Sequence, residues 1–588
     1  MSPAALDTCE TQVLPSTPKL AIPQLDNAKA LVLKAVADAV PCPPGPLQDY
    51  LAEEGQLRNQ GTLRSLVGQF QGVPGVVSLS AGFPPPHIFP FSSISLQLTN
   101  GTQIALPDMT AAQQYNASLR GYPPLVHWAT NHVQALHRPP SVHDILITNG
   151  ANHSLELITS LFLQRGDALL VEEYTYPVIL ESIAMPKGYR TLGVPIDNFG
   201  IIPLGLERVL EEAAAAAATP GGPKMPKLLY TVPTGHNPTG CTITPERRKQ
   251  VYALCRKFDV WILEDDPYFY LQWGSAAQSM LEAESIDPET VEEDALRSSM
   301  PGLKGLLRPP VSTTNTTLST SSPSPSPATS SSSILSSSSS GPVSMSGGTN
   351  VNTSTTSSMS SSYLALDVDC RVIRVDTFSK FLAPGVRLGW VTARSDLIEK
   401  LTSALQTHTV GPCSLSQTVV AATLAAWGDA GLDAHLRQIQ AEYSRRCAVL
   451  CRAASRELGN GCLAEWDVPR AGMFLWVKIN GVEDAVEVWD ALHDAKIIVC
   501  PGRVMAAAAA GVGGSFRKEE DSPHTTGNTT INNCAANKLK SPFVRVAFSS
   551  VDSAGLKEGM RRFGNVLRKH HRDTKAQQQQ QQQDMVVV

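Results

Sequence analysis

The chain has 588 residues, of which 42% are hydrophobic, and a formal net charge of −5. This length exceeds what one compact core needs, so we expect several domains, or fewer domains with segments that lie outside a core. A weakly acidic chain argues against a nucleic-acid binder, which normally carries a basic face. No apolar run approaches the roughly 18 residues that a membrane-spanning helix requires.

The cysteines and the N-terminus indicate an intracellular protein. The 11 cysteines are scattered and form no CxxC pair, so we expect reduced thiols and no metal site. The N-terminal residues show no positively charged segment followed by an apolar one, so we predict no secretory signal. The chain has no arginine before Arg58 and carries Asp7 and Glu10, whereas transit peptides are Arg-rich and poor in acids. We therefore expect a cytoplasmic location, with organelle targeting left open.

Four segments have compositions that do not support a packed core. Residues 1–45 are Pro-rich, residues 276–362 become a Ser/Thr/Pro tract, residues 506–540 begin with an alanine run, and residues 574–588 contain a glutamine tract. Such segments bury too little apolar surface to offset the entropy lost on ordering. We predict a disordered N-terminal extension, a disordered insertion, a low-complexity insertion and a disordered tail, in that order.

Short apolar runs alternate with helical patterns along the remaining chain. Residues 144–148 are typical of a buried strand, and Leu155, Ile158 and Leu161 follow at helical spacing. Further apolar runs of strand length lie at 168–171, 228–232, 260–263, 372–375 and 388–391. This alternation predicts a mostly parallel α/β sheet covered by helices on both faces. In such folds ligands bind beyond the carboxyl ends of the strands.

Lys380 follows one of these predicted strands. Burial among apolar neighbours favours the neutral, nucleophilic form of a lysine amine. Nearby Thr377 and Ser379 offer hydroxyl groups and Arg387 offers a cationic fork, which together suit a phosphate. A lone lysine at a strand end is usually a solvated surface residue. The Ser-Lys pair followed by Gly-x-Arg favours a binding site.

Other predicted strands are also followed by polar residues. Asp265 suits a pyridinium nitrogen, and Tyr268 and Asn237 suit a ring oxygen. Each of these motifs taken alone is more typical of a polar turn than of a binding site.

A predicted helix begins after Gly150, where the backbone of Ala151 and Asn152 can approach a phosphate. Tyr176 follows the next strand and can stack on a ring, although an aromatic residue there is more often part of the core.

These motifs, in this order, resemble the class I/II aminotransferases of fold type I, which use pyridoxal 5′-phosphate (PLP). Within that class the chain is most similar to the kynurenine/2-aminoadipate and fungal aromatic aminotransferases. The resemblance runs from about residue 60 to about residue 570, skips the insertions, and is carried by residues 78–84, 230–240, 264–268, 375–389, 471–476 and 543–550.

The resemblance implies a role for each matching residue. Lys380 would carry PLP as a Schiff base and shuttle a proton, and Asp265 would pair with the ring nitrogen. The other residues implied in cofactor binding are Asn237 and Tyr268 at the ring oxygen, Tyr176 stacked on the ring, and Ala151, Asn152, Thr377, Ser379, Arg387 and Tyr115 at the phosphate, with Tyr115 coming from the partner subunit.

Substrate binding is implied at a second group of residues. Arg545 would clamp the substrate α-carboxylate, with Gly82 and Asn237 close to it, and Arg64 would meet the substrate side chain. The chain departs from the family pattern at Ala151, where relatives often have a hydroxyl residue. The insertion at 506–540 also falls between two substrate-site segments.

The resemblance implies a large PLP-binding domain at 107–410 with a seven-stranded sheet, and a small α+β domain that combines 46–106 with 411–573, in a homodimer. The implied reaction moves an amino group from an aromatic amino acid, kynurenine or 2-aminoadipate to a 2-oxo acid such as 2-oxoglutarate. A PLP-dependent lyase of the cysteine-conjugate β-lyase type is an alternative, because both chemistries begin alike. A non-catalytic regulator of the same fold would need a DNA-binding domain, and the N-terminal extension is too Pro-rich for one. We expect no nucleic-acid or membrane partner.

Overall fold

The computed structural model describes residues 44–59, 74–75, 77, 79, 82–115, 118–282, 362–459, 461–507 and 540–586. Arg64 therefore lies outside the described residues. So do residues 1–43 of the predicted N-terminal extension, 283–361 of the first insertion and 508–539 of the second.

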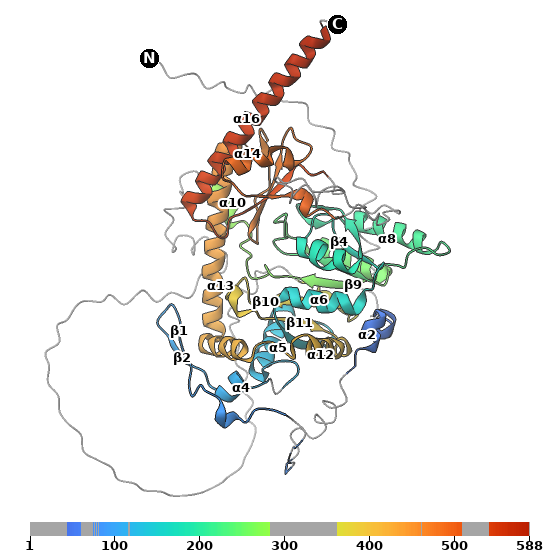
Figure 1. The fold of residues 1–588 in the computed structure, drawn as a ribbon, viewed down its shortest axis with the longest axis vertical. Helices are drawn as coiled ribbons and strands as arrows, with labels where there is room; N and C mark the ends of the chain where they lie inside the picture. Colours follow the sequence, from blue (N-terminus) through green and yellow to red (C-terminus); the bar gives the residue numbers. More distant parts are fainter. Residues whose placement is uncertain are drawn as a thin grey trace, which may run out of the picture.

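A seven-stranded sheet in the order β3-β11-β10-β9-β8-β4-β5 forms the centre of the larger part of the fold (Figure 1). Its strands are β3 (Asp144–Thr148), β4 (Ala168–Glu172), β5 (Arg190–Val194), β8 (Leu228–Thr231), β9 (Trp261–Asp265), β10 (Val372–Thr377) and β11 (Gly389–Ala393). Strand β11 is antiparallel to both of its neighbours, and all other pairs are parallel. The predicted α/β fold class is confirmed. The sequence pattern missed only β5, an edge strand that is mostly half-buried and so lacks a continuous apolar run.

Helices cover both faces of this sheet because alternate strand residues point to opposite sides. On one face Ile147, Leu229 and Ile262 pack in a core shared with α5 (Pro123–His137), α8 (Pro203–Ala217) and α9 (Pro245–Lys257). On the other face Leu146 and Leu263 pack in a core shared with α6 (Ala151–Phe162) and α12 (Ser395–Thr409). Burial on both faces explains why the strands are apolar along their whole length.

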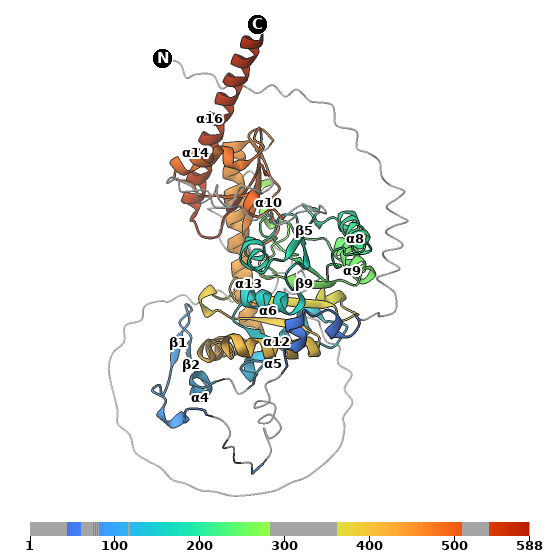
Figure 2. The same cartoon turned by 45° about the vertical axis from the view of Figure 1, so that its right-hand side comes forward.

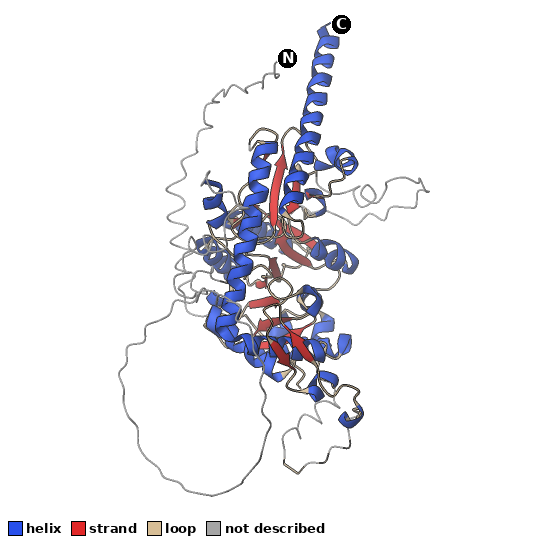
Figure 3. Ribbon diagram, turned by 90° about the vertical axis from the view of Figure 1, so that its left-hand side faces the viewer, coloured by secondary structure: helices blue, strands red, loops and turns tan. Residues whose placement is uncertain are grey.

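A second, antiparallel sheet has the order β12-β13-β15-β14, with β12 (Ala464–Glu465), β13 (Phe474–Ile479), β14 (Cys500–Pro501) and β15 (Phe543–Ala547). It lies beside α14 (Trp489–Asp494), α13 (Ser414–Leu458) and α16 (Ser553–Val586). Helix α13, labelled in Figure 1, runs past both sheets, and Figure 3 shows this long helix from the side. It changes direction at Gly428, whose φ of 56° and ψ of −172° are not helical.

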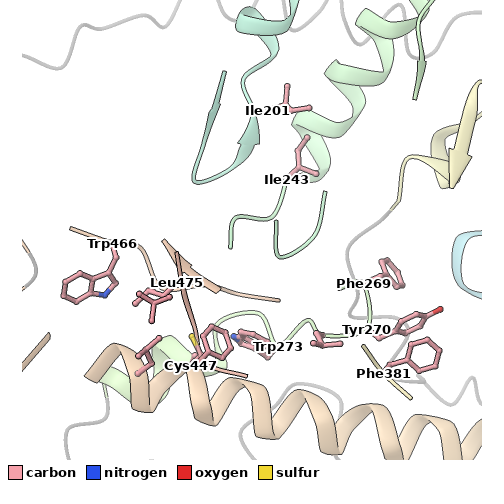
Figure 4. Close-up of a cluster of buried hydrophobic side chains, with 14 of the residues drawn as sticks. Ile201, Ile243, Phe269, Tyr270, Trp273, Phe381, Cys447, Trp466 and Leu475 are labelled. Carbon is pink, nitrogen blue, oxygen red and sulfur yellow. The ribbon is translucent and has the colours of Figure 1, made fainter. Parts of the chain in front are cut away.

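One apolar core joins the two sheets. It contains Val372 from the large sheet, Leu475 from the small one and Cys447 from α13. Figure 4 shows part of this cluster, in which Trp273 and Cys447 lie near Leu475, and Phe381 lies near Tyr270. The indole N–H of Trp273 donates to the carbonyl oxygen of Pro469 at 3.1 Å. The segment after β9 is therefore held against the small sheet as well as against its own.

An arm made of β1 (Ser95–Gln97), β2 (Gln103–Ala105) and α4 (Met109–Gln113) projects at the end of the molecule opposite α16 (Figure 2). Ile104, Leu106 and Ala112 of the arm pack against Ala422 of α13. The remaining short elements are η1 (Leu47–Asp49), α2 (Glu53–Leu57), η2 (Pro86–Ile88), the π-helix η3 (Val178–Ala184), α7 (Met185–Lys187), β6 (Ile196–Asp197), β7 (Gly200–Ile201), α10 (Ala276–Glu282), η5 (Leu364–Leu366), η6 (Pro384–Val386), η7 (Ala485–Val488) and η8 (Gly502–Val504).

The structure differs from three expectations about segment boundaries. Residues 276–282, assigned to a disordered insertion, form α10, whose Ala277 and Met280 are buried one helical turn apart. Residues 574–586, assigned to a disordered tail, continue α16. Glutamine is a good helix former, and extending a helix already nucleated by packed residues costs little. Finally, residues 46–59 were assigned to the small domain, yet the N–H of Ala52 donates to the carbonyl oxygen of Leu161 on α6 at 2.7 Å. The division into two domains otherwise stays a prediction.

Candidate active site

The carboxyl ends of β3, β4, β8, β9 and β10 lie along one edge of the large sheet. Asp265 on β9 is the register partner of Val375 on β10, and Thr377 on β10 is the partner of Gly389 on β11, which in turn pairs with Thr148 on β3. Adjacent strands are about 4.8 Å apart. The motifs after these strands therefore lie along one edge of the sheet, with those after β9 and β10 on adjacent strands.

Asp265 is buried, with 3% of its surface exposed. Its Oδ2 accepts a hydrogen bond of 2.9 Å from the hydroxyl of Tyr230, while its Oδ1 has no partner among the described residues. Burial raises the pKa of Asp265 to about 7, and the nearby carboxylates of Asp266, Asp376 and Glu172 push it the same way, against the Tyr230 hydrogen bond. A cationic N–H donor at Oδ1 would stabilise the carboxylate. A protonated pyridine nitrogen is such a donor.

Lys380 is half-buried in the turn that follows β10. Burial lowers the pKa of its amine, and the positive charge of Arg387 lowers it further. A lysine whose ammonium form is disfavoured supplies more of the neutral amine, which is the nucleophilic form.

The start of α6 and the turn after β10 form a cup of hydrogen-bond donors. Gly150, with a φ of 86°, precedes α6, and no side chain caps the helix. A Cβ atom on Gly150 would lie 3.1 Å from Nη2 of Arg387. Nη1 of Arg387 lies 3.5 Å from Oγ of Ser379, which is 3.0 Å from Oγ1 of Thr377. Uncapped helix N–H groups, a guanidinium and hydroxyls suit a phosphate.

Arg545 on β15 reaches from the small sheet to this edge. Its Nη1 donates to Oδ1 of Asn237 at 2.6 Å, and its guanidinium lies 4.3 Å from the ring centre of Phe474. Its Nε has no partner among the described residues. A guanidinium with free donors suits a carboxylate, which it binds in a two-pronged geometry.

Tyr268 and Tyr176 lie close to these groups. Tyr268 is buried, and burial raises the pKa of its phenol, with the charge of Asp265 adding to the rise. The hydroxyl of Tyr176 donates to Oδ1 of Asn152 at 3.4 Å, so it spans from the end of β4 to the start of α6. The pKa of Tyr176 is raised as well, chiefly by burial. Both phenols are therefore neutral hydrogen-bond donors at neutral pH.

Two predicted residues lie on exposed parts of this chain. Gly82 has no heavy atom within 4 Å of the position of an added Cβ. Tyr115 is 55% exposed and packs against Phe83, with 5.7 Å between ring centres. Their predicted roles stay predictions, as does that of Arg64.

The sequence reasoning missed several residues around the site. Tyr230 was quoted only as part of a motif, although a tyrosine in a buried strand needs a partner for its hydroxyl. Arg374 and Asp376 were not singled out, although two charges inside a buried strand are a signal that they pair. Phe474, His236 and Glu172 carried no local signal that sets them apart from ordinary strand and turn residues.

Arg374 forms a buried ion cluster under the site. It donates to Asp376 through Nε at 2.9 Å and Nη2 at 2.8 Å, and its Nη1 lies 3.1 Å from Asp266 and 3.2 Å from Glu264. The four side chains are fully buried. This cluster fixes β9 and β10 side by side immediately before Asp265 and Lys380 leave the strands.

Comparison with known proteins identifies the family. The family model for aminotransferase class I and II matches residues 100–295 and 349–517. The mitochondrial kynurenine/alpha-aminoadipate aminotransferase of Mus musculus is 30% identical over 438 residues, which are 73% of this chain and 83% of the relative. An aromatic amino acid aminotransferase of Schizosaccharomyces pombe is 28% identical over 547 residues, 89% of this chain and 98% of the relative.

Solved structures agree on the fold. The aminotransferase Aro8 from Candida albicans superposes with a TM-score of 0.67 at 24% identity, over 90% of this chain and 99% of that one. The fold is that of the fold-type I PLP enzymes. The chain belongs to the class I and II aminotransferases, and it is a transaminase. No helix in the part of the chain that the structure describes is long and apolar enough to cross a membrane.

Proposed function

We propose that this aminotransferase binds PLP at the carboxyl edge of its large sheet. The observation that carries the proposal is Asp265, a buried carboxylate with one unpaired oxygen and a raised pKa, on the same edge as Lys380 and the donor cup around Gly150. These three features match the ring nitrogen, the aldehyde and the phosphate of PLP. The resident groups of the site fit the cofactor.

Each residue then has a definite task. PLP supplies an electron-withdrawing ring that stabilises negative charge at the Cα of an attached amino acid. Asp265 would keep the ring nitrogen protonated, and Asn237 and Tyr268 would hold the ring oxygen. The phosphate would be held by Thr377, Ser379, Arg387 and the backbone at Ala151 and Asn152, and Tyr176 would pack against the ring. Lys380 would hold the cofactor, and its Nζ would accept and return the proton at the substrate Cα.

We propose that the amino donor is an aromatic amino acid, kynurenine or 2-aminoadipate, and that 2-oxoglutarate is a good acceptor. The names of the mouse and fission-yeast relatives support these amino donors. Arg545 binds the α-carboxylate that all of these substrates share. Arg64 pairs with the distal carboxylate of 2-aminoadipate, so Arg64→Ala lowers kcat/KM for 2-aminoadipate more than for phenylalanine.

We further propose a homodimer in the cytoplasm. The described residues that flank the arm in the chain expose large apolar side chains, namely Leu79, Phe83, Ile88, Phe91 and Tyr115, of which Phe83 and Tyr115 pack together. Contiguous exposed apolar surface is typical of an interface that a partner covers. A second copy of the chain, covering this surface, would bring Tyr115 to the phosphate of its partner's site. Light scattering measures the mass, and cell fractionation tests the location.

The test of the cofactor site is Lys380→Ala, with Lys257→Ala as the control at a lysine on α9 that pairs with Glu207. The purified proteins are incubated with PLP, reduced with borohydride and mapped by peptide mass. We expect the label on the Lys380 peptide in parent and control. We expect no label, and no absorbance band of covalently bound cofactor, in Lys380→Ala. A label on another lysine of the parent would exclude Lys380 as the attachment site.

A further inference from the structure

His236 is a buried histidine directly before Asn237, in the turn that follows β8. Only 1% of its surface is exposed. Nδ1 of its ring lies 2.8 Å from Oγ1 of Thr239. Its backbone N–H donates to the carbonyl oxygen of Cys241 at 2.8 Å, and its backbone carbonyl oxygen accepts from the N–H of Gly240 at 2.7 Å. The imidazole is therefore fixed within the turn by side chain and backbone together.

The other ring nitrogen of His236 faces Glu172, the last residue of β4. Nε2 lies 3.4 Å from Oε2 of Glu172. Oε1 of Glu172 accepts from the hydroxyl of Thr231 at 2.5 Å and from the N–H of Val232 at 3.1 Å, both at the end of β8. Glu172 thus ties together the ends of two adjacent strands, and His236 supplies its ionic partner.

Burial and charge decide the protonation of this pair. Burial alone would lower the pKa of His236, but Glu172 and the side chain of Cys241 together outweigh it, and the pKa is raised to about 10. The titratable groups that act on the imidazole are Glu172 from β4 and the thiol of Cys241 from the same turn. Glu172 in turn acts on Tyr230 of β8 and Asp265 of β9. The imidazole is therefore protonated at neutral pH.

The pair lies where two parts of the active site meet. Four residues beyond Glu172 the chain reaches Tyr176, which bonds to Asn152. One residue beyond His236 it reaches Asn237, which accepts from Arg545. The relative position of the ring-stacking side chain and the amide therefore depends on how the ends of β4 and β8 are held together.

We propose that His236 is a positioning residue of the active site, which acts with Glu172 to hold the Asn237 amide in register with Tyr176 and Arg545. The inference rests on the proposed PLP site and adds a residue that touches neither cofactor nor substrate. Its effect reaches the reaction through Asn237, and through the field of Glu172, whose negative charge raises the pKa of both Asp265 and Tyr230.

Three variants separate the effect of the contact between His236 and Glu172, called the tether below, from the effect of the imidazole charge. His236→Leu removes the hydrogen-bonding side chain and the imidazole charge together. We expect KM for every amino donor to rise about tenfold. We also expect the pH midpoint of the absorbance change of bound PLP to rise by at least about 0.5 unit, because the carboxylate of Glu172 stays unpaired near the ring. His236→Gln keeps a hydrogen-bonding side chain and should recover most of the KM but not the midpoint. Adding Glu172→Gln to His236→Gln removes the isolated charge and should return the midpoint to the parent value.

The matched control is His143→Gln. His143 forms another buried pair, 3.1 Å from Asp367, but it precedes β3, while Asp367 precedes β10, at the opposite edge of the sheet. We expect His143→Gln to lower the melting temperature and to leave the midpoint and KM unchanged.

The outcomes decide between the inference and a purely structural role. A folded His236→Gln variant with the parent midpoint overturns the proposal, and so does a midpoint that stays displaced in the double variant. If His236→Leu and His236→Gln do not fold, Glu172→Leu alone breaks the same tether and should raise KM, and an unchanged KM there also overturns the proposal. A parent protein that forms no PLP absorbance band contradicts the proposed function instead.

Discussion

Asp265 and Asp266 are consecutive, both buried, and differ in what surrounds them. Oδ2 of Asp266 lies 3.1 Å from a guanidinium nitrogen of Arg374, and it also accepts from the hydroxyl of Thr234 at 3.2 Å. Asp265 accepts one bond, from the neutral hydroxyl of Tyr230. Oδ1 of each carboxylate has no hydrogen-bond partner among the described residues, so the difference lies in the cation beside Asp266. Burial raises the pKa of both, but only for Asp266 does a neighbouring cation, Arg374, oppose the rise strongly.

The difference separates a carboxylate that completes the fold from one kept for a ligand. The ion cluster of Arg374 satisfies its charges within the protein, and so it holds β9 and β10 in place whether or not anything is bound. Asp265 is costly to ionise until a cation reaches its free oxygen. Perturbed carboxylates of this kind are typical of functional sites. Variants on each side of the comparison should therefore behave in opposite ways.

The largest effect is expected on the structural side, from Arg374→Met. It leaves Asp266, Asp376 and Glu264 buried without their cation, and breaking such a cluster costs about 3–5 kcal/mol. Urea denaturation of the variant measures the loss. Arg247→Ala is the control, because its pair with Asp197 is partly exposed and should contribute less than about 1 kcal/mol. A loss below about 1 kcal/mol in Arg374→Met would mean that the cluster does not stabilise the fold.

The second prediction has the opposite sign. Because the folded-state pKa of Asp265, about 7, exceeds its ordinary value of 3.8, the folded protein binds a proton more readily than the unfolded chain between these two pH values. Stability without PLP is therefore lost as pH rises from 3.8 to about 7, and the full cost remains above pH 7. Asp265→Asn removes this cost, so the apoprotein should gain about 1–3 kcal/mol at pH 8 and nothing near pH 4.

Thermal unfolding of the two apoproteins across that pH range checks the sign. The same variant should bind PLP at least about tenfold more weakly, since a neutral amide does not pair with the ring nitrogen. If apo Asp265→Asn were no more stable than the apo parent at pH 8, the carboxylate would carry no electrostatic cost and the contrast with Asp266 would fail.

The sequence could predict one half of this comparison and not the other. Asp265, Lys380 and Asn237 stand in ordered motifs at strand ends, and strand ends of a parallel sheet meet at one edge, so local patterns suffice to bring them together. The partners of Arg374 come from β9 and β10, which are separated by about 100 residues that include the insertion. The pairing of Arg374 with Asp376 on the same strand has a local signal, but nothing local shows that Arg374 also pairs with Glu264 and Asp266. The same holds for Glu172 and His236, which meet only because β4 and β8 are neighbours in the sheet.

Composition also misled at the ends of segments. It does not register that Ala277 and Met280 recur at helical spacing, or that glutamines after a packed helix can extend it. The boundaries of the low-complexity segments therefore predicted the end of the packed core better than they predicted the ends of α10 and α16.

The smallest effect is expected at the donor cup around Gly150, where Arg387 supplies a positive charge. No carboxylate pairs with Arg387 in the described part of the chain, and Gly150 leaves its guanidinium room at the start of α6.

Gly150→Ala forces a side chain into a left-handed conformation, at a cost of about 1–2 kcal/mol, and places its Cβ 3.1 Å from Nη2 of Arg387. Gly166→Ala is a matched control, because Gly166 has a φ of 90° and no atom within 4 Å of an added Cβ. Both variants should lose similar stability in the apo form, since both place an alanine at a similar positive φ, 86° and 90°. Only Gly150→Ala should also weaken PLP binding, by about tenfold or 1.4 kcal/mol, because Arg387 must move away from the phosphate. Spectral titration with PLP measures this difference, and equal affinities in the two variants would remove Gly150 and Arg387 from the phosphate site.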